Sequence, residues 1–422
     1  MARENPALIF TSLNHFIDME WMLYAFELTR KDGAVGIDNQ TGKDYALNLH
    51  SNIADLLGRI KTGTYRAPAV RRVYIPKSDG KMRGLGVPTF EDKIAQRAIL
   101  MLLESIYEQD FMSCSYGFRV GKSAHQALQS LRNHIMDDGV KWVIDADISK
   151  FFDDLSHEKL REILDERVVD GVVRRMIDKW LKAGFLESGE IHYMSKGTPQ
   201  GGVISPCLAN IYLHAVLDKW FEKMVKPVLK KKAYLVRFCD DFVLLFADHS
   251  DMSRVFKVLN KRLNKFDLNV HETKTKIVDF RFTRWRQRVD DKYTTAFSFL
   301  GFTHVWGKSL KGKNIVLQIT AKDRLSRAIK SIYDFCKTHR HYPVEFQHKR
   351  LCQKMKGHFA YFGITGNHRK LRLMAHQVER IWRKWLSRRK RGSQIKWIDF
   401  KNKILNRFPL PDAKIMHKYT VQ

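Results

Sequence analysis

The sequence has few features of a membrane, secreted or zinc-binding protein. Its five cysteines are never closer than sixteen positions, which excludes CxxC zinc sites; they are Cys114, Cys207, Cys239, Cys336 and Cys352. No stretch approaches the ~18 uninterrupted apolar residues of a transmembrane helix, and the start, MARENPALIF, lacks the basic-then-apolar layout of a secretion signal. Repeats and low-complexity tracts are absent too. We therefore expect a globular, cytoplasmic protein with reduced thiols.

Acidic residues are the other shortage. The 422 residues include 45 aspartates and glutamates against 75 lysines and arginines, a formal net charge of +30. The excess is greatest between Ala321 and Gln422, where 26 basic residues accompany 6 acidic ones. Such a charge predicts a polyanionic partner that binds along the C-terminal part. With 44% hydrophobic residues the chain can still bury a large core, and its length suggests two or three domains.

Two adjacent aspartates interrupt the most apolar part of the chain. Asp240 and Asp241 lie between the runs AYLVRFC and FVLLF, from Ala233 to Phe246, a pattern that predicts a tight β-hairpin with both carboxylates at its tip. At ~4 Å and an effective dielectric of ~20, two such charges repel by about 4 kcal/mol, which a divalent metal ion offsets. The alternative is an ordinary surface turn, since Asp favours turns. A metal site needs a third carboxylate from elsewhere.

Candidates for this third carboxylate lie in a predicted strand, residues 141–148, with the sequence KWVIDADI. Residues two apart on a strand share a face, so Asp145 and Asp147 project together. Either one can meet the hairpin tip. The residue pattern therefore leaves both aspartates as candidates.

Two further segments carry groups suited to an anionic, planar ligand. Residues 70–88 alternate apolar and basic residues around an SDG turn, which predicts a hairpin with Lys77 before the turn and Arg83 after it. Two cations on one hairpin can hold a triphosphate, although an exposed edge strand guarded by cations has the same pattern. Residues 196–213 predict a Gly/Pro/Gln loop and then a helix. The loop glycines permit close backbone approach to a planar ligand, and Gln200 offers it an amide.

Helical spacing dominates both ends of the chain. Residues 1–65 predict a helical module, residues 91–107 an amphipathic helix, and the chain beyond Thr320 three helices, with Asn367 as the N-cap of the last. This last helix is strongly basic, which suits the phosphates of a nucleic acid. A solvated helix face has the same appearance, but the charge of the whole C-terminal segment favours a polyanion.

In this order the segments resemble the reverse transcriptases encoded by bacterial group II introns, from about Leu8 to the C-terminus. The matching blocks are RRVYIPKSDGKMRGLGVPTFEDKIAQRAI, SYGFRVGKSAHQAL, VIDADISKFFDDLSH, GTPQGGVISPCLANIYL, the FCDD hairpin, LNVHETKTKIVDF, FSFLGFTHVWGKSLKGK and KGHFAYFGITGN followed by VERIWRKWLSRR. The resemblance implies an α+β fold: a right-hand polymerase with fingers, a palm of antiparallel sheet plus helices, and a three-helix thumb.

The resemblance also implies domain boundaries. In chain order these are an N-terminal helical extension at 1–65, fingers with part of the palm at 66–140, a palm at 141–318 that includes a finger/palm insertion at 155–200, a maturase-like α-helical thumb at 319–392 and a short basic tail at 393–422. No endonuclease domain is expected after the thumb.

Carried over residue by residue, the resemblance selects Asp147 over Asp145 and joins it to Asp240 and Asp241 as ligands of two Mg²⁺ ions for nucleotidyl transfer. The implied dNTP-binding residues are Lys77, Arg83, Phe152, Gln200 and Lys274. Phe152 matches the position where an aromatic ring excludes a ribose 2′-hydroxyl, and Lys274 is equally consistent with a solvated lysine in a charged turn. The RNA-binding candidates are Arg71, Arg72, Arg383, Lys384, Arg388 and Arg389.

The implied activity is RNA-directed DNA synthesis, with a structured RNA, an RNA/cDNA duplex and dNTPs as partners and no membrane. Two cellular roles stay open: group II intron splicing and retromobility, or antiphage defence by copying a dedicated noncoding RNA. The hairpin has Phe238-Cys239 before the aspartates where intron-encoded members usually have Tyr-Ala, and a cysteine there also resembles some free-standing defence enzymes. A maturase-like RNA chaperone without polymerase activity is the alternative from another functional class.

Overall fold

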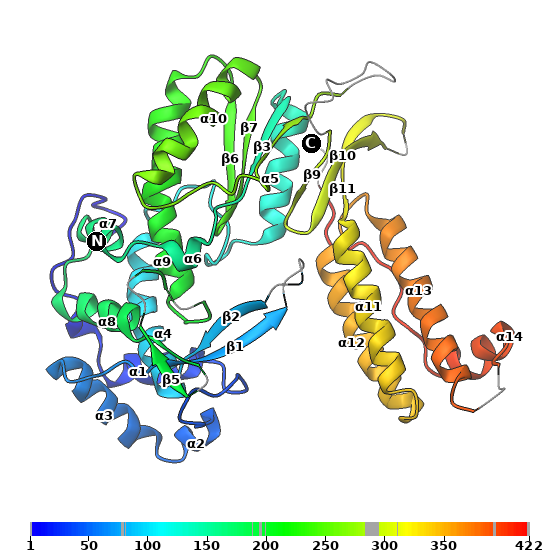
Figure 1. Cartoon of the computed structure of the whole chain (residues 1–422), viewed down its shortest axis with the longest axis horizontal. Helices are drawn as coiled ribbons and strands as arrows, with labels where there is room; N and C mark the ends of the chain where they lie inside the picture. The colour runs from blue at the N-terminus through cyan, green and yellow to red at the C-terminus, as the bar shows by residue number, and fades with distance from the viewer. Residues whose placement is uncertain are drawn as a thin grey trace. The chain divides into compact units, whose positions relative to one another are not determined.

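The computed structural model describes most of the chain. The chain divides into two compact units, Met1–Ala127 with Ala146–Lys276 and Leu128–Asp145 with Ile277–Gln422; Figure 1 colours the chain by residue number. The described residues are 2–76, 80, 82–187, 189–193, 196–198, 200–282, 295–309, 311–390 and 394–419. The predicted anion-binding residue Lys77 lies outside this set.

Helices open the first unit, as the apolar spacing predicts. Two of them begin at side-chain caps: Asp18 accepts a hydrogen bond from the Trp21 backbone N–H, and Thr41 forms a capping box with Asp44. The first two helices pack against a longer one whose buried face is almost entirely apolar. The elements are α1 (Met19–Leu28), α2 (Gly42–Ala46), α3 (Leu49–Thr62) and α4 (Phe90–Tyr107).

A four-stranded sheet contains the predicted hairpin of residues 70–88. Its strands are β1 (Val70–Pro76), β2 (Met82–Val87), β4 (Phe185–Glu187) and β5 (Glu190–His192). β1 and β2 pair antiparallel in continuous register, β4 pairs parallel with β1, and β5 pairs antiparallel with β4. The order β2-β1-β4-β5 makes β2, which carries Arg83, an edge strand.

The Asp-Asp stretch forms the antiparallel hairpin that its pattern predicts, β6 (Ala233–Phe238) and β7 (Asp241–Phe246). β3 (Trp142–Ala146) is shorter than the predicted strand at 141–148, so Asp147 follows the strand instead of lying within it. With β8 (Lys276–Asp279) these strands form a sheet of order β6-β7-β3-β8.

The helix predicted after the Gly/Pro/Gln loop is present as α9 (Ser205–Leu213), and further helices lie before and after it in the chain. Asp170 caps the helix of residues 171–182, and a proline lies in the first turn of the helix that begins at Ser205. No helix in the described part of the chain is long and apolar enough to cross a membrane. The elements are α5 (Ala124–Asp137), α6 (Phe151–Asp154), α7 (His157–Asp165), α8 (Gly171–Lys182), α9 (Ser205–Leu213), η2 (His214–Asp218), η3 (Trp220–Val225), η4 (Lys226–Val228) and α10 (His249–Asn264).

The C-terminal part of the second unit consists of an antiparallel sheet followed by three helices, which confirms the three helices predicted beyond Thr320. Leu371, Val378 and Trp382 line an apolar cluster between these helices, and the Trp382 indole donates to Gln347 Oε1 at 3.0 Å. The elements are β9 (Phe297–Phe299), β10 (Phe302–Lys308), β11 (Asn314–Thr320), α11 (Lys322–Thr338), α12 (Val344–Phe362) and α13 (His368–Ser387), and the strand order is β11-β10-β9.

The role predicted for Asn367 is wrong in part. It occupies the N-cap position of α13, but its side chain makes no capping hydrogen bond. The amide instead donates to Thr320 Oγ1 and the Phe362 carbonyl, both at 2.8 Å, and its oxygen accepts from the Thr320 backbone N–H at 3.0 Å. Because Asn367 is fully buried, satisfying its amide outweighs capping, and it joins the end of β11 to the turn between α12 and α13.

The C-terminal segment packs into the same apolar cluster. After α13 the chain forms α14 (Trp397–Asp399) and η5 (Phe400–Leu405). Phe400 has no exposed surface, and its ring meets that of Trp382 edge to face at 5.7 Å between centroids. This segment is therefore part of the core of the second unit.

Replacing Phe400 by alanine should lower the free energy of unfolding by about 3–5 kcal/mol, because it leaves a cavity beside Trp382. Denaturant unfolding followed by tryptophan fluorescence measures this loss. The matched control is Ile398→Ala, two residues earlier and 67% exposed, for which a change within about 0.5 kcal/mol is expected. Equal losses for the two variants would contradict the packing described here.

Candidate active site

The tip of the β6–β7 hairpin is a strained two-residue turn. Phe238 pairs with Asp241, so Cys239 and Asp240 form the turn. Cys239 has a φ of 59°, a conformation that favours glycine in such turns. Cys239 is buried, and a Cβ added to Gly117 would lie 2.5 Å from the backbone nitrogen of Cys239. The tip is therefore held against Gly117, with Asp240 half-buried and Asp241 exposed.

Beneath the tip lies a fully buried ion pair. The Arg237 guanidinium donates to both carboxylate oxygens of Asp218, at 2.7 and 2.5 Å. Its remaining nitrogen donates to Asn210 Oδ1 at 2.9 Å and to the Cys239 carbonyl at 3.1 Å. Burial acts to raise the pKa of Asp218, but the positive charge of Arg237 holds it below its usual range. Arg237 thereby fixes the backbone of the turn that carries Asp240.

The sequence interpretation missed this ion pair. Its signal was present: Arg237 is the one charged residue inside the apolar strand AYLVRF, and a buried arginine needs an acidic partner. The partner, Asp218, lies in the π-helical segment after α9. Nothing in the residue pattern singles it out.

Asp147 is held at the end of β3 by the segment that follows α10. Its carbonyl accepts from the His271 N–H at 2.7 Å, and its own N–H donates to Thr275 Oγ1 at 3.3 Å. Its carboxylate pairs with the Lys274 ammonium at 2.8 Å, with side chains 30% and 60% exposed. Lys274 remains largely exposed, but it contacts the candidate acid directly.

Asp147 and the hairpin tip act on each other electrostatically. Burial raises the pKa of Asp240, and the negative charge of Asp147 raises it further, while Arg83 acts in the opposite direction. Asp147 and Arg83 thus each lie within electrostatic range of Asp240. Asp145, the alternative acid, lies inside β3 and belongs to the second unit.

The chemistry of this donor set fits a divalent cation. Asp147, Asp240 and Asp241 offer only carboxylate oxygens, which Mg²⁺ prefers, and a raised carboxylate pKa beside a second carboxylate is relieved by a cation. The Lys274 ammonium supplies positive charge to Asp147. The residue types fit, but the three carboxylates do not converge in this structure: among the described residues, no three acidic, histidine or cysteine side chains lie close enough together to hold a metal ion.

A loop joins two of the other predicted site residues to the β2 strand. The Thr198 N–H donates to the Phe152 carbonyl at 2.8 Å, and the Gln200 carbonyl accepts from the Gly86 N–H at 2.6 Å. Gly201 has a φ of 113°, and a Cβ there would lie 2.6 Å from the Gly86 carbonyl oxygen. Only glycine fits this contact, which links Phe152 and Gln200 to the strand that carries Arg83.

Arg71 and Arg72, predicted to contact RNA, lie half-buried on β1. The Arg72 guanidinium lies 4.4 Å from the centroid of the Phe185 ring and covers Gly84. Such cation–π packing ties β1 to its neighbours β2 and β4. Arg72 therefore has a packing role that the sequence interpretation did not assign.

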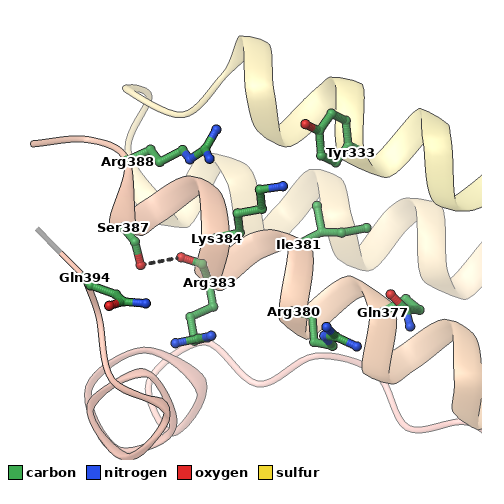
Figure 2. Close-up of a pocket in the computed structure, with 9 residues that line it drawn as sticks. All are labelled: Tyr333, Gln377, Arg380, Ile381, Arg383, Lys384, Ser387, Arg388 and Gln394. Atoms are coloured by element: carbon green, nitrogen blue, oxygen red, sulfur yellow. Dashed lines mark hydrogen bonds between the residues drawn. The ribbon is translucent and has the colours of Figure 1, made fainter. Parts of the chain in front are cut away.

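In the second unit, a basic pocket of about 600 Å³ opens along α13. Figure 2 shows cations and the Gln377 amide of α13 along its wall, with Tyr333 of α11 on the neighbouring helix and Gln394 on the segment after α13. Arg383 donates to the Ile395 carbonyl at 2.7 Å, and the Lys384 ammonium lies 5.2 Å from the Tyr333 ring centroid. The lining residues are Tyr333, Gln377, Arg380, Ile381, Arg383, Lys384, Ser387, Arg388 and Gln394.

The cations of this pocket repel one another. Arg380, Lys384 and Arg388 are spaced four residues apart, so they form one stripe of like charge along α13, and none of the described residues that line the pocket is acidic. The helix dipole offsets part of this repulsion near the C-terminal end. Arg389 differs, because two of its nitrogens donate to the Arg340 and Tyr342 carbonyls at 2.6 Å. Arg380 is a lining residue that the sequence interpretation missed.

Comparison with known proteins identifies the protein family that this sequence matches. Residues 75–304 match the family model described as "Reverse transcriptase (RNA-dependent DNA polymerase)". The chain is 38% identical over 224 residues to "Group II intron-encoded protein LtrA" of Lactococcus lactis subsp. cremoris, a match that covers 52% of this chain and 36% of that protein. It is 34% identical over 276 residues to "Protein YkfC" of Escherichia coli (strain K12), covering 58% and 72%. With "Nuclear intron maturase 2, mitochondrial" of Arabidopsis thaliana, identity is 25% over 229 residues, covering 43% and 30%.

The buried ion pair makes a stability prediction. Asp218→Leu leaves Arg237 buried without a counter-charge and should cost about 3–5 kcal/mol of the free energy of unfolding. Asp218→Leu combined with Arg237→Met removes both charges and should recover most of that loss. Denaturant titrations of the parent, the single variant and the double variant measure both effects. A double variant as unstable as the single one would show that charge pairing is not what this site contributes.

Proposed function

Because the chain belongs to the reverse transcriptase family, we propose that it is an RNA-directed DNA polymerase of the group II intron type that copies a structured RNA. The observation that carries this proposal is the electrostatic coupling of Asp147 to Asp240 at the tip of the β6–β7 hairpin. A turn with a purely structural role would not require a second carboxylate, that of Asp147, within electrostatic range of Asp240.

The proposed architecture is a right hand. In this proposal the sheet of β3 and β6–β8 with its helices is the palm, the β1–β2 hairpin and its surroundings are the fingers, and α11, α12 and α13 are the thumb. Antiparallel sheets, helices and the family match over residues 75–304 support this assignment.

Asp147, Asp240 and Asp241 are the proposed ligands of two Mg²⁺ ions. Bound Mg²⁺ polarises a primer 3′-hydroxyl and neutralises charge on the transferring phosphoryl group. Other residues of the chain position these aspartates. Arg237 holds the turn that carries Asp240, and His271 and Thr275 hold the backbone of Asp147. Lys274, paired with Asp147, is proposed to meet the triphosphate when metal ions take its place beside that acid.

The nucleotide is proposed to lie against Arg83, Phe152 and Gln200. The loop contacts to Gly86 and Phe152 support this, since they gather the three residues around one backbone segment. Phe152 follows the fully packed Phe151, whose ring it meets edge to face at 5.2 Å, so its own position is well defined. A fixed aromatic ring there would exclude a ribose 2′-hydroxyl and favour dNTPs.

RNA is the proposed ligand of the α13 pocket. Its cations form no ion pair with an acidic side chain of the described residues, and Arg383 is held in place by the Ile395 carbonyl, so the stripe suits consecutive phosphates. Intron-encoded relatives and a relative named as an intron maturase support a role in intron splicing and mobility. The same pocket also supports the second candidate, a maturase-like RNA chaperone, because it does not depend on the carboxylates. Antiphage defence and a dedicated noncoding RNA template remain predictions.

Primer extension on an RNA template tests the polymerase. Asp240→Asn and Asp147→Asn should each lower the rate by at least about a thousandfold, since each removes a carboxylate charge that metal ions need. The matched control is Asp153→Asn, an exposed acid six residues after Asp147, which should extend at the parental rate. A parent protein that binds RNA but makes no cDNA with Mg²⁺ and dNTPs would favour the chaperone.

Salt titration of RNA affinity tests the α13 pocket. Lys384→Gln with Arg388→Gln should weaken binding and reduce the slope of log K against log salt by about 1.4, because single-stranded contacts release ~0.7 counterion per phosphate. Arg369→Gln with Arg372→Gln, two exposed cations at the start of α13 outside this pocket, is the matched control. An equal change in slope for both pairs would mean that only overall charge matters.

A further inference from the structure

A second basic groove lies in the first unit, outside the proposed catalytic site. It has a volume of about 770 Å³ and is formed by the segment between α3 and β1, by the exposed side of α8 and by the end of β5. Figure 1 shows α8 and β5 as neighbours, and β5 extends the sheet through β4 to β1. The candidate dNTP residues Arg83, Phe152 and Gln200 are not among its lining residues.

The groove carries excess positive charge. Arg66, Arg175 and Lys182 are exposed on its walls, and no acidic side chain among the described residues pairs with them. The one carboxylate in the lining, Asp178, is already paired with Arg161 at 2.7 Å. These cations therefore have no partner within the described chain, and bound anions would relieve their repulsion.

Lys179, a half-buried lysine, also lines the groove. The Lys179 ammonium donates to the Gly63 and Tyr65 carbonyls at 2.7 and 2.5 Å. Its pKa is lowered by burial and by the charges of Arg175 and Arg66. Arg175 and Arg66 thus both lie within electrostatic range of the Lys179 ammonium, whose hydrogen bonds go to the two backbone carbonyls.

An aromatic ring lies beside the cations. Tyr193, directly after β5, is 75% exposed, and its neighbour on the strand, Ile191, is 50% exposed. The Tyr193 ring lies against Gly184, where an added Cβ would be 3.2 Å from Tyr193 Cδ1. The Gly184 carbonyl also accepts from the Val70 N–H at 3.1 Å. Gly184 therefore supports the ring from beneath and leaves its surface to solvent.

We propose that this groove binds a single-stranded segment of RNA, with Arg66, Arg175 and Lys182 on successive phosphates and a base stacked on Tyr193. Cations beside an exposed ring are the elements of single-strand binding, since an unpaired base can stack and its phosphates can meet the cations. A duplex hides its base faces, and an acidic peptide has no use for the ring. The proposal rests on the proposed function only in naming RNA as the polyanion.

Fluorescence anisotropy of a labelled, non-pairing 12-nucleotide RNA tests the groove in the full-length protein, with excess unlabelled RNA/DNA duplex to occupy duplex-binding surfaces. Arg66→Gln with Arg175→Gln should raise the Kd about tenfold and reduce the salt slope by about 1.4. Tyr193→Ala should raise the Kd by about five- to a hundredfold and leave that slope unchanged.

Matched controls remove the same charge and the same ring elsewhere in this unit. Lys257→Gln with Lys261→Gln alters two exposed cations of α10, and Tyr24→Ala alters a ring of α1 that is 53% exposed. Both should stay within about twofold of the parent. All substituted side chains are exposed, and thermal unfolding identifies any variant that has lost the fold.

Three results would overturn the proposal: equal losses in the groove and α10 variants, unchanged RNA affinity in Tyr193→Ala, or a labelled 12-residue oligoglutamate that binds the parent more tightly than the RNA and is lost in the groove variant. The last result would identify a docking site for an acidic protein. Primer extension on a template with a two-nucleotide overhang tests the polymerase proposal separately from the groove proposal. A parent protein that extends no primer would refute polymerase activity, and the anisotropy comparison of the groove variants would be unaffected.

Discussion

The buried pair between Arg237 and Asp218 is the interaction on which the site depends. A charged pair without solvent is stable only when every hydrogen-bonding group is satisfied, and here the remaining arginine donors go to Asn210 and to the Cys239 carbonyl. The strained turn at Cys239 therefore has a fixed support beneath it. Two apolar side chains in place of Arg237 and Asp218 can give the protein the same free energy of unfolding. They would lack the guanidinium donor that binds the Cys239 carbonyl and holds the turn carrying Asp240.

Opposite charges are separated within this molecule. Burial and the negative charge of Asp147 raise the pKa of Asp240, while Arg83 acts in the opposite direction and Lys274 pairs with Asp147. The two basic pockets, along α13 and between α8 and β5, contain cations that the described chain does not neutralise. A nucleic acid can use both features, since its phosphates meet the pockets while its reacting end requires cations beside the carboxylates.

Elements with a regular apolar period were predictable from the sequence, and contacts between distant residues were not. The hairpin from Ala233 to Phe246 and the three helices after Thr320 follow from their spacing. Asn367 was misassigned as a helix cap because Thr320, far away in sequence, takes its amide. The resemblance named Lys274 as a site residue, but its ion pair with Asp147 was not predicted, nor was that of Asp218 with Arg237. Nothing local to Asp147 or Arg237 indicates which charged side chain the fold brings there.

The central claim is that Asp147 and Asp240 share divalent cations across the hairpin tip. Electron paramagnetic resonance of Mn²⁺, in a complex with an RNA template, a chain-terminated DNA primer and the next dNTP, counts the bound ions directly. The account predicts about two ions per protein molecule, as in other two-metal nucleotidyl transfers, and fewer when either aspartate is replaced by asparagine. The same number of bound ions in the parent, in Asp147→Asn and in Asp240→Asn would contradict it.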